Sequence, residues 1–127
     1  INNILEDKEG NIWFSSTADG LIKLSQSKFI SYSMRDGLND NRIAAVCALD
    51  NSSYLVATYR KLFRIDNGLV KPYSFKDKNL ENFRGDPTQL YKDSKGNIWT
   101  SFTSGNIIRI SKDGVKLFQP KGISNTS

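Results

Sequence analysis

Short runs of alternating apolar and polar residues follow one another along the chain, and polar turn residues bound each run. The first 33 residues contain four such runs, which read INNILED, NIWFSS, LIKLS and FISYS. Alternation with a period of about two is typical of half-buried β-strands, and no long segment shows the helical period of about 3.6. Between the first two runs, Asp7 can accept hydrogen bonds from backbone amides and Gly10 can adopt the positive φ of a tight turn. The pattern predicts short antiparallel strands joined by turns.

Almost the same eleven residues occur twice, as EDKEGNIWFSS at 6–16 and as KDSKGNIWTSF at 92–102. The repeated motif contains Asp7, Gly10 and Trp13 in the first copy and Asp93, Gly96 and Trp99 in the second, 86 residues later. Half of this interval is 43 residues, and adding 43 to Asp7 gives Asp50, just before the strand-like YLVAT. The spacing therefore predicts three units, 1–42, 43–85 and 86–127. The middle unit is degenerate, because it lacks the Trp and the Gly.

A repeat of about 40 to 50 residues with four strands is typical of a propeller blade. We therefore predict an all-β protein, a β-propeller fragment of three four-stranded antiparallel blades of about 43 residues each. Because Trp13 and Trp99 recur at the same place in the repeat, we expect them to pack between neighbouring sheets and not to bind a ligand. Residues 76–87 are the least strand-like and predict a longer loop between blades, with room for a helical turn.

Composition excludes several kinds of chemistry. The net charge is +5, but Lys and Arg alternate with Asp and Glu and form no cluster, so we expect no nucleic-acid binding. The chain has no His, and its single Cys47 lies in an apolar run, which removes Ser–His and Cys–His nucleophile pairs and the common zinc sites. We find no glycine-rich phosphate loop and no metal-ligand spacing, and therefore predict no cofactor and no metal. The longest apolar run, residues 43–49, is too short to cross a membrane.

The segment ILEDKEGNIWFSSTADGLIKLS, residues 4–25, resembles the regulator-propeller repeat. That repeat has an aliphatic strand, Asp, two residues, Gly, a small polar residue, an aliphatic residue, Trp, and then a small-residue strand and a Gly-aliphatic turn. RDGLNDNRIAAV, residues 35–46, is similar to the link between repeats of this family. The resemblance covers nearly the whole chain, although the middle unit matches only in its apolar positions and Asp50.

The resemblance implies a function and a location. Regulator-propeller repeats are found chiefly in the periplasmic sensor region of hybrid two-component histidine kinases of polysaccharide-using bacteria. There they commonly recognise oligosaccharides and switch on the genes for polysaccharide use. Three blades do not close a ring. We therefore expect a piece of such a sensor, whose partners are an oligosaccharide, the remaining blades and a β-sandwich of the parent protein. We expect the piece to self-associate and to make no direct membrane contact.

In a propeller, loops that join the second strand to the third, and one blade to the next, gather on one rim. The predicted rim loops are 17–19, 59–61, 102–104, 35–41 and 84–86. Tyr59 and Arg60 replace the small polar loop of the first unit, and such a pair suits a sugar that carries carboxylate or sulfate. Arg35 and Phe102 could add charge and stacking. The predicted ligand-binding residues are therefore Tyr59, Arg60, Arg35 and Phe102.

Two alternatives remain open at the level of the sequence. The repeated motif also resembles the Asp-box turn of glycoside-hydrolase propellers, and such an enzyme needs two carboxylates about 5 to 10 Å apart. Asp19, Asp40 and Asp86 lie in predicted rim loops, but turn formation explains each of them, so we predict no catalytic residues in this segment. The second alternative is a non-catalytic propeller that binds other proteins.

Overall fold

The computed structural model describes residues 3–16, 18–50, 52–75 and 85–120, which contain twelve strands and one short 3-10 helix. The first sheet contains β1 (Asn3–Glu6), β2 (Ile12–Ser15), β3 (Leu21–Ser25) and β4 (Lys28–Tyr32). The 3-10 helix η1 (Met34–Asp36) follows it. The second sheet contains β5 (Ile43–Ala48), β6 (Ser53–Thr58), β7 (Leu62–Asp66) and β8 (Leu69–Pro72). The third contains β9 (Pro87–Lys92), β10 (Ile98–Phe102), β11 (Ile107–Ser111) and β12 (Gly114–Phe118).

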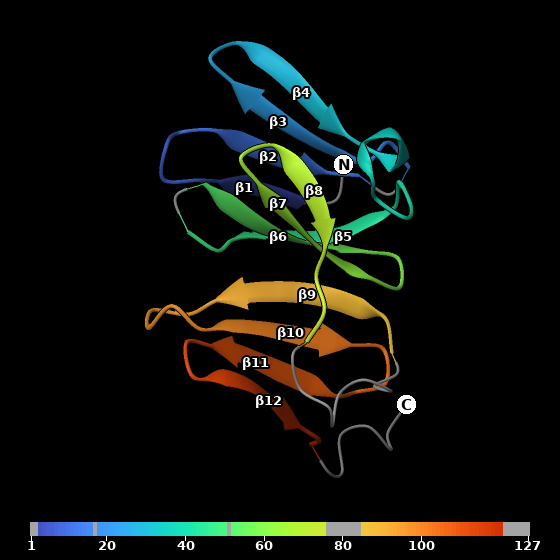
Figure 1. Ribbon diagram of the computed structural model, residues 1–127, viewed down its shortest axis with the longest axis vertical. Helices are drawn as coiled ribbons and strands as arrows, with labels where there is room; N and C mark the ends of the chain where they lie inside the picture. Colours follow the sequence, from blue (N-terminus) through green and yellow to red (C-terminus); the bar gives the residue numbers. More distant parts are fainter. Residues whose placement is uncertain (1–2, 17, 51, 76–84, 121–127) are drawn as a thin grey trace.

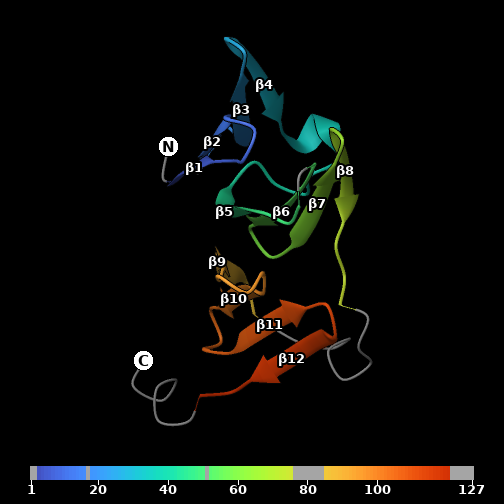
Figure 2. The ribbon, with the colours of Figure 1, turned by 90° about the vertical axis from the view of Figure 1, so that its left-hand side faces the viewer.

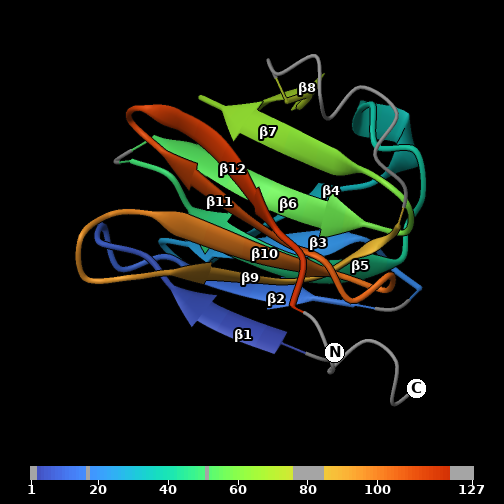
Figure 3. The ribbon, with the colours of Figure 1, turned by 90° about the horizontal axis from the view of Figure 1, so that it is seen from below.

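Each sheet is an antiparallel meander in which the strands pair in chain order. The three sheets are stacked one after another along the longest axis of the molecule (Figure 1). Their first strands β1, β5 and β9 lie close together, whereas the last strands spread apart (Figure 2). Seen from below, β1 and β9 lie toward one side of the stack and β8 and β12 toward the other (Figure 3). This wedge-like stacking confirms the predicted all-β propeller architecture.

The first and second sheets meet at a core that contains Trp13. Its side chain is completely buried, and its ring centroid lies 4.3 Å from that of Tyr54 in β6. Trp13 therefore packs between two sheets, as we expected from the repeat. The buried residues of this core are Trp13, Leu21, Tyr32, Leu38, Ile43, Val46, Tyr54, Val56, Phe63 and Ile65.

The second and third sheets meet at a smaller apolar core around Leu55, Cys47 and Ile98. Cys47 is a free, buried thiol, and burial raises its pKa to about 11 while nearby Lys92 opposes the shift. Such a thiol is a packing residue and not a reactive one. In the same region, Lys92 Nζ donates a hydrogen bond of 3.2 Å to the carbonyl of Leu49.

The strand pairing corrects the predicted place of Asp50 in the repeat. Before each turn, the last strand pair is Glu6–Ile12 in the first sheet, Ala48–Tyr54 in the second and Lys92–Ile98 in the third. The next residue is Asp7, Leu49 and Asp93, respectively. Leu49 therefore holds the place of Asp7, and Asp50 lies one residue later. The two successive repeats are 42 and 44 residues long, so their mean of 43 placed the middle unit one residue out of register.

The three sheets fall inside the predicted units 1–42, 43–85 and 86–127, whose boundaries themselves stay a prediction. Most of the predicted loop at 76–87 and the residues after 120 lie outside the described residues. Trp99 differs from Trp13, because it lies half-buried on the outer face of the third sheet and not between two sheets. No helix in the described part of the chain is long and apolar enough to cross a membrane.

Candidate ligand-binding site

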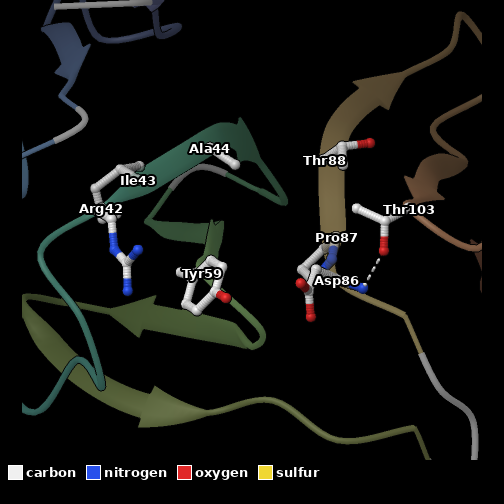
Figure 4. A pocket seen from close by; sticks show the side chains of 8 residues that line it. All are labelled: Arg42, Ile43, Ala44, Tyr59, Asp86, Pro87, Thr88 and Thr103. Atoms are coloured by element: carbon white, nitrogen blue, oxygen red, sulfur yellow. Dashed lines mark hydrogen bonds between the residues drawn. The ribbon is translucent and has the colours of Figure 1, made fainter.

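Two equivalent loop pairs lie on one rim, at the junction of the second and third sheets (Figure 4). In the second sheet, the amide of Tyr59 donates to the carbonyl of Arg42 at 3.1 Å. In the third sheet, the amide of Thr103 donates to the carbonyl of Asp86 at 2.9 Å. The same backbone bond thus joins the start of a sheet to its second turn in both repeats. These two loop pairs form the two walls of the candidate site, one from the second sheet and one from the third. Their side chains differ at equivalent positions, so the two walls differ in chemistry.

The wall from the second sheet is aromatic and cationic. The guanidinium carbon of Arg42 lies 3.9 Å from the ring centroid of Tyr59, and that of Arg60 lies 5.3 Å from it. Arg42 also donates two hydrogen bonds to Asp40, of 3.0 Å from Nε and 2.7 Å from Nη2. These bonds hold the pKa of Asp40 low, at about 2. Arg42 is therefore neutralised by Asp40, while the Tyr59 side chain remains 39% exposed.

The wall from the third sheet carries a carboxylate and two hydroxyl groups. The backbone amide of Asp86 donates a hydrogen bond of 3.0 Å to Thr103 Oγ1. Thr88 follows Pro87 at the start of β9, and its hydroxyl bonds to Ser101 in β10. Hydrogen bonds thus position both threonines, and Asp86 points into the space between the walls (Figure 4).

Between these walls is a cleft of about 390 Å³. Its lining consists of Arg42, Ile43, Ala44, Tyr59, Asp86, Pro87, Thr88 and Thr103. Apolar surface dominates, with few polar groups directed inward, which is the usual composition of a small-molecule site. An aromatic ring beside a carboxylate and hydroxyls can pack against an apolar ring face and bond to hydroxyl groups at its edge.

The structure separates the four predicted ligand-binding residues. Tyr59 lines the cleft, whereas Arg60 and Phe102 line a neighbouring hollow of about 280 Å³ that also contains Tyr73. Arg35 lies on η1, outside both linings. Their role in binding remains a prediction.

Sequence reasoning missed Arg42 and Thr88. It placed Asp86 and Thr103 in predicted rim loops, but named neither of them as a ligand-binding residue. The signal was available in the repeat, because Arg42 and Asp86 are 44 residues apart, as are Tyr59 and Thr103. Aligning the second and third units at this interval would have shown that Arg42 and Asp86 are equivalent, as are Tyr59 and Thr103.

In the described part of the chain, no three His, Cys, Asp or Glu side chains come close enough to hold a metal ion. Asp40, one of the three acids considered, has a lowered pKa, whereas a general acid of a glycosidase needs a raised one.

Comparison with known proteins supports the resemblance seen in the sequence. The family model "Two component regulator propeller" matches residues 1–18. No curated protein matches the chain. Among solved structures, the extracellular domain of the hybrid two component system BT4673 from B. thetaiotaomicron has a TM-score of 0.74 at 21% identity over 92% of this chain. The extracellular domain of BT3049, another hybrid two component system of B. thetaiotaomicron, has a TM-score of 0.70 at 16% identity over 91% of this chain.

A different kind of protein shares the same fold. A virginiamycin B lyase from Staphylococcus aureus, made catalytically inactive by replacing a histidine with alanine, has a TM-score of 0.70 at 16% identity and covers 95% of this chain. This chain spans 41% of the lyase, 18% of BT4673 and 16% of BT3049, so it matches a part of each. The family match at residues 1–18 confirms the regulator-propeller resemblance, and the chain is a propeller fragment that resembles the extracellular sensor domains of two-component systems.

Proposed function

We propose that this chain is part of the periplasmic ligand-sensing propeller of a hybrid two-component histidine kinase, and that its ligand is an oligosaccharide whose binding controls polysaccharide-utilisation genes. The observation that carries the proposal is the cleft between Tyr59 and Asp86, built from equivalent loops of two repeats. The likeness to extracellular domains of hybrid two component systems supports the sensor role.

The cleft also bears on which oligosaccharide would bind. The guanidinium of Arg42 is already paired with the carboxylate of Asp40, and Asp86 adds a negative charge to the opposite wall. An acidic sugar would therefore depend on Arg60, which lies at the edge of the neighbouring hollow. A neutral oligosaccharide would need only the ring of Tyr59 and the polar groups of Asp86 and Thr103.

Calorimetric titration with neutral and acidic oligosaccharides tests this proposal. We expect Tyr59→Ala and Asp86→Asn each to lower affinity about tenfold or more, because each removes a direct contact. Tyr91→Ala is the matched control, since Tyr91 is 66% exposed on the outer face of β9, away from the cleft. The proposal fails if no oligosaccharide binds, or if the control lowers affinity as much as the cleft variants.

The lyase fold offers an enzymatic alternative, but no observation on this chain favours it. The inactive virginiamycin B lyase differs from its active form at a histidine, and the 127 residues contain no histidine that could take that role. We therefore propose a binding role for this segment.

A further inference from the structure

The turn that carries Tyr59 is anchored differently from the equivalent turn of the third sheet. In the third sheet, the hydroxyl of Thr103 accepts a hydrogen bond of 3.0 Å from the amide of Asp86 in the preceding link. Tyr59 stands at the place of Thr103, but its hydroxyl bonds to no residue in the described part of the chain. Another side chain therefore anchors this turn, and the ring of Tyr59 is left to line the cleft.

Asn39 supplies this anchor from the link between the first and second sheets. Its Nδ2 donates a hydrogen bond of 2.9 Å to the carbonyl of Tyr59, and its Oδ1 accepts one from the hydroxyl of Thr58. Because a carbonyl can only accept, the bond to Tyr59 requires the amide nitrogen of Asn39. Asn39 is itself exposed, so these two bonds hold the turn and not a core.

The conformation that Asn39 holds is unfavourable for an arginine. Arg60 has a φ of +78°, whereas the φ of Tyr59 is not positive. This combination belongs to a type II β-turn, whose second central residue has a φ of about +80° and is usually glycine. The turn of the third sheet does place a glycine in such a conformation, because Gly105 has a φ of +88°. An L side chain is strained there, so the turn at Arg60 needs an external restraint.

A type I turn is the unstrained alternative for the same four residues. It differs from type II mainly by a half rotation of the peptide group between the two central residues, which gives the second of them a φ of about −90°. In this turn, that group consists of the Tyr59 carbonyl and the Arg60 N–H. The rotation carries the carbonyl away from Asn39, so the bond between them forms only in the strained conformation.

The orientation of this peptide group decides which backbone atom the turn offers to a ligand. The C=O and N–H of a trans peptide point in opposite directions. While the carbonyl bonds to Asn39, the Arg60 N–H points away from Asn39 and bonds to no described residue. Arg60 lines the hollow beside the cleft, and Asn39 lines neither. The N–H is therefore a free donor at the edge of the candidate site, whereas the rotated peptide would offer an acceptor.

We infer that Asn39 is a positioning residue of the ligand site, which holds the peptide between Tyr59 and Arg60 so that its N–H donates to an oxygen of the ligand. The inference rests on the proposed function, because it takes the ligand to be an oligosaccharide, whose hydroxyl or acidic groups supply such an oxygen. Strained backbone of the kind found at Arg60 is concentrated at binding sites, where the surrounding structure holds it in place.

Nuclear magnetic resonance measures the position of the peptide without any ligand. The Overhauser effect between the Tyr59 Hα and the Arg60 amide proton is strong in a type II turn and weak in a type I turn. We expect it to weaken in Asn39→Asp, because a carboxylate cannot donate to the Tyr59 carbonyl. Adding Arg60→Gly should restore it, since glycine adopts a positive φ without strain. Asn41→Asp is the matched control, because it adds the same charge to the same link and keeps the oxygen that accepts from the Met34 amide.

Calorimetric titration with an oligosaccharide that the wild type binds gives the consequence for affinity. We expect Asn39→Asp to lower the affinity about fivefold, the size of one hydrogen bond, while the melting temperature changes little. In an Arg60→Gly background, the same replacement should have little effect on affinity. Ligand binding should also shift the Arg60 amide resonance and slow the exchange of this proton with solvent.

Several outcomes would overturn the inference. An Overhauser effect that stays unchanged in Asn39→Asp is the most direct of them. An equal loss of affinity in both backgrounds or in Asn41→Asp would do the same, as would an Arg60 amide that the ligand leaves unchanged. If the wild type binds no oligosaccharide, the proposed function fails and the role of the donor fails with it. The Overhauser effect then shows on its own whether Asn39 holds the peptide.

Discussion

Trp13 and Trp99 occupy the same place in the same turn, but one is buried and the other lies on an open face. Asp7 accepts hydrogen bonds from the amides of Glu9 and Asn11, from the Asn11 side chain and from Trp13. Asp93 accepts the equivalent four from Lys95, Asn97 and Trp99. The turn therefore forms from local contacts alone, whether or not another sheet covers it.

The difference between the two turns is the contribution of the neighbouring sheet. Tyr54 adds a fifth hydrogen bond to Asp7 and buries the tryptophan. Burial alone would raise the pKa of Asp7, but the bonds from Tyr54, Trp13 and Asn11 outweigh it and hold the pKa well below its usual value. The pKa of Asp93 is lowered too, chiefly by the Trp99 hydrogen bond. The comparison separates the hydrogen bonds that form within one repeat from the additional bond and the burial that a neighbouring sheet provides.

The largest predicted effect comes from removing the carboxylate at the covered turn. Asp7→Ala should lower the free energy of unfolding by about 3 kcal/mol or more, because it leaves the Tyr54 hydroxyl and the Trp13 N–H buried without an acceptor. Asp93→Ala removes the same local bonds at an open face and should cost much less. Urea denaturation of both variants measures the difference, and equal losses would show that the neighbouring sheet adds nothing to the turn.

A smaller effect is expected from pH. Because the folded-state pKa of Asp7 is lowered, its ionised form stabilises the protein above the ordinary value of 3.8, and this stabilisation is lost as pH falls below it. We therefore expect the stability gap between the wild type and Asp7→Asn to be widest near neutral pH and to narrow from about pH 4 downward. Urea denaturation across this range gives the gap. When Asp7→Asn is made in a Tyr54→Phe background, the stability gap that it causes should depend less on pH. An unchanged pH dependence of this gap would contradict the role of the Tyr54 hydrogen bond.

The smallest effect concerns two buried threonines, one bonded and one not. Thr100 is 1% exposed, and its hydroxyl has no hydrogen-bond partner among the described residues. Thr100→Val should therefore raise the free energy of unfolding by about 1 kcal/mol. Thr58, whose hydroxyl bonds to Asn39, is the matched control, and Thr58→Val should lower it by about as much. Thermal denaturation of both variants measures these changes. A loss of stability in both would mean that the Thr100 hydroxyl has a hydrogen-bond partner.

Much of the fold could be predicted from the sequence, because strand alternation and the turn chemistry of Asp7 and Gly10 act over a few residues. The register of the middle unit could not be predicted, since nothing in the sequence indicates that Leu49 holds the place of the aspartate. Only strand pairing shows that Leu49 and Leu55 stand for Asp7 and Trp13.

The candidate site was harder to predict, because its walls come from different repeats. Tyr59 stood out as a departure from the first unit, and it does line the cleft. Arg42 and Asp86 lie in links between sheets, where no apolar pattern marks a position. Which links face one another depends on how the sheets stack, and no local preference specifies that.

The carboxylate of Asp7 also has a consequence for how the protein unfolds. It joins its own turn to the next sheet, so the first and second sheets should gain and lose their structure as one cooperative unit. The second and third sheets meet through Leu49, Leu55 and Ile98, where the hydrogen bond from Lys92 Nζ ends on the backbone carbonyl of Leu49 and not on a carboxylate of the turn. In a linear array with unequal junctions, fraying starts at the weaker one. The third sheet should therefore exchange its amide hydrogens before the other two.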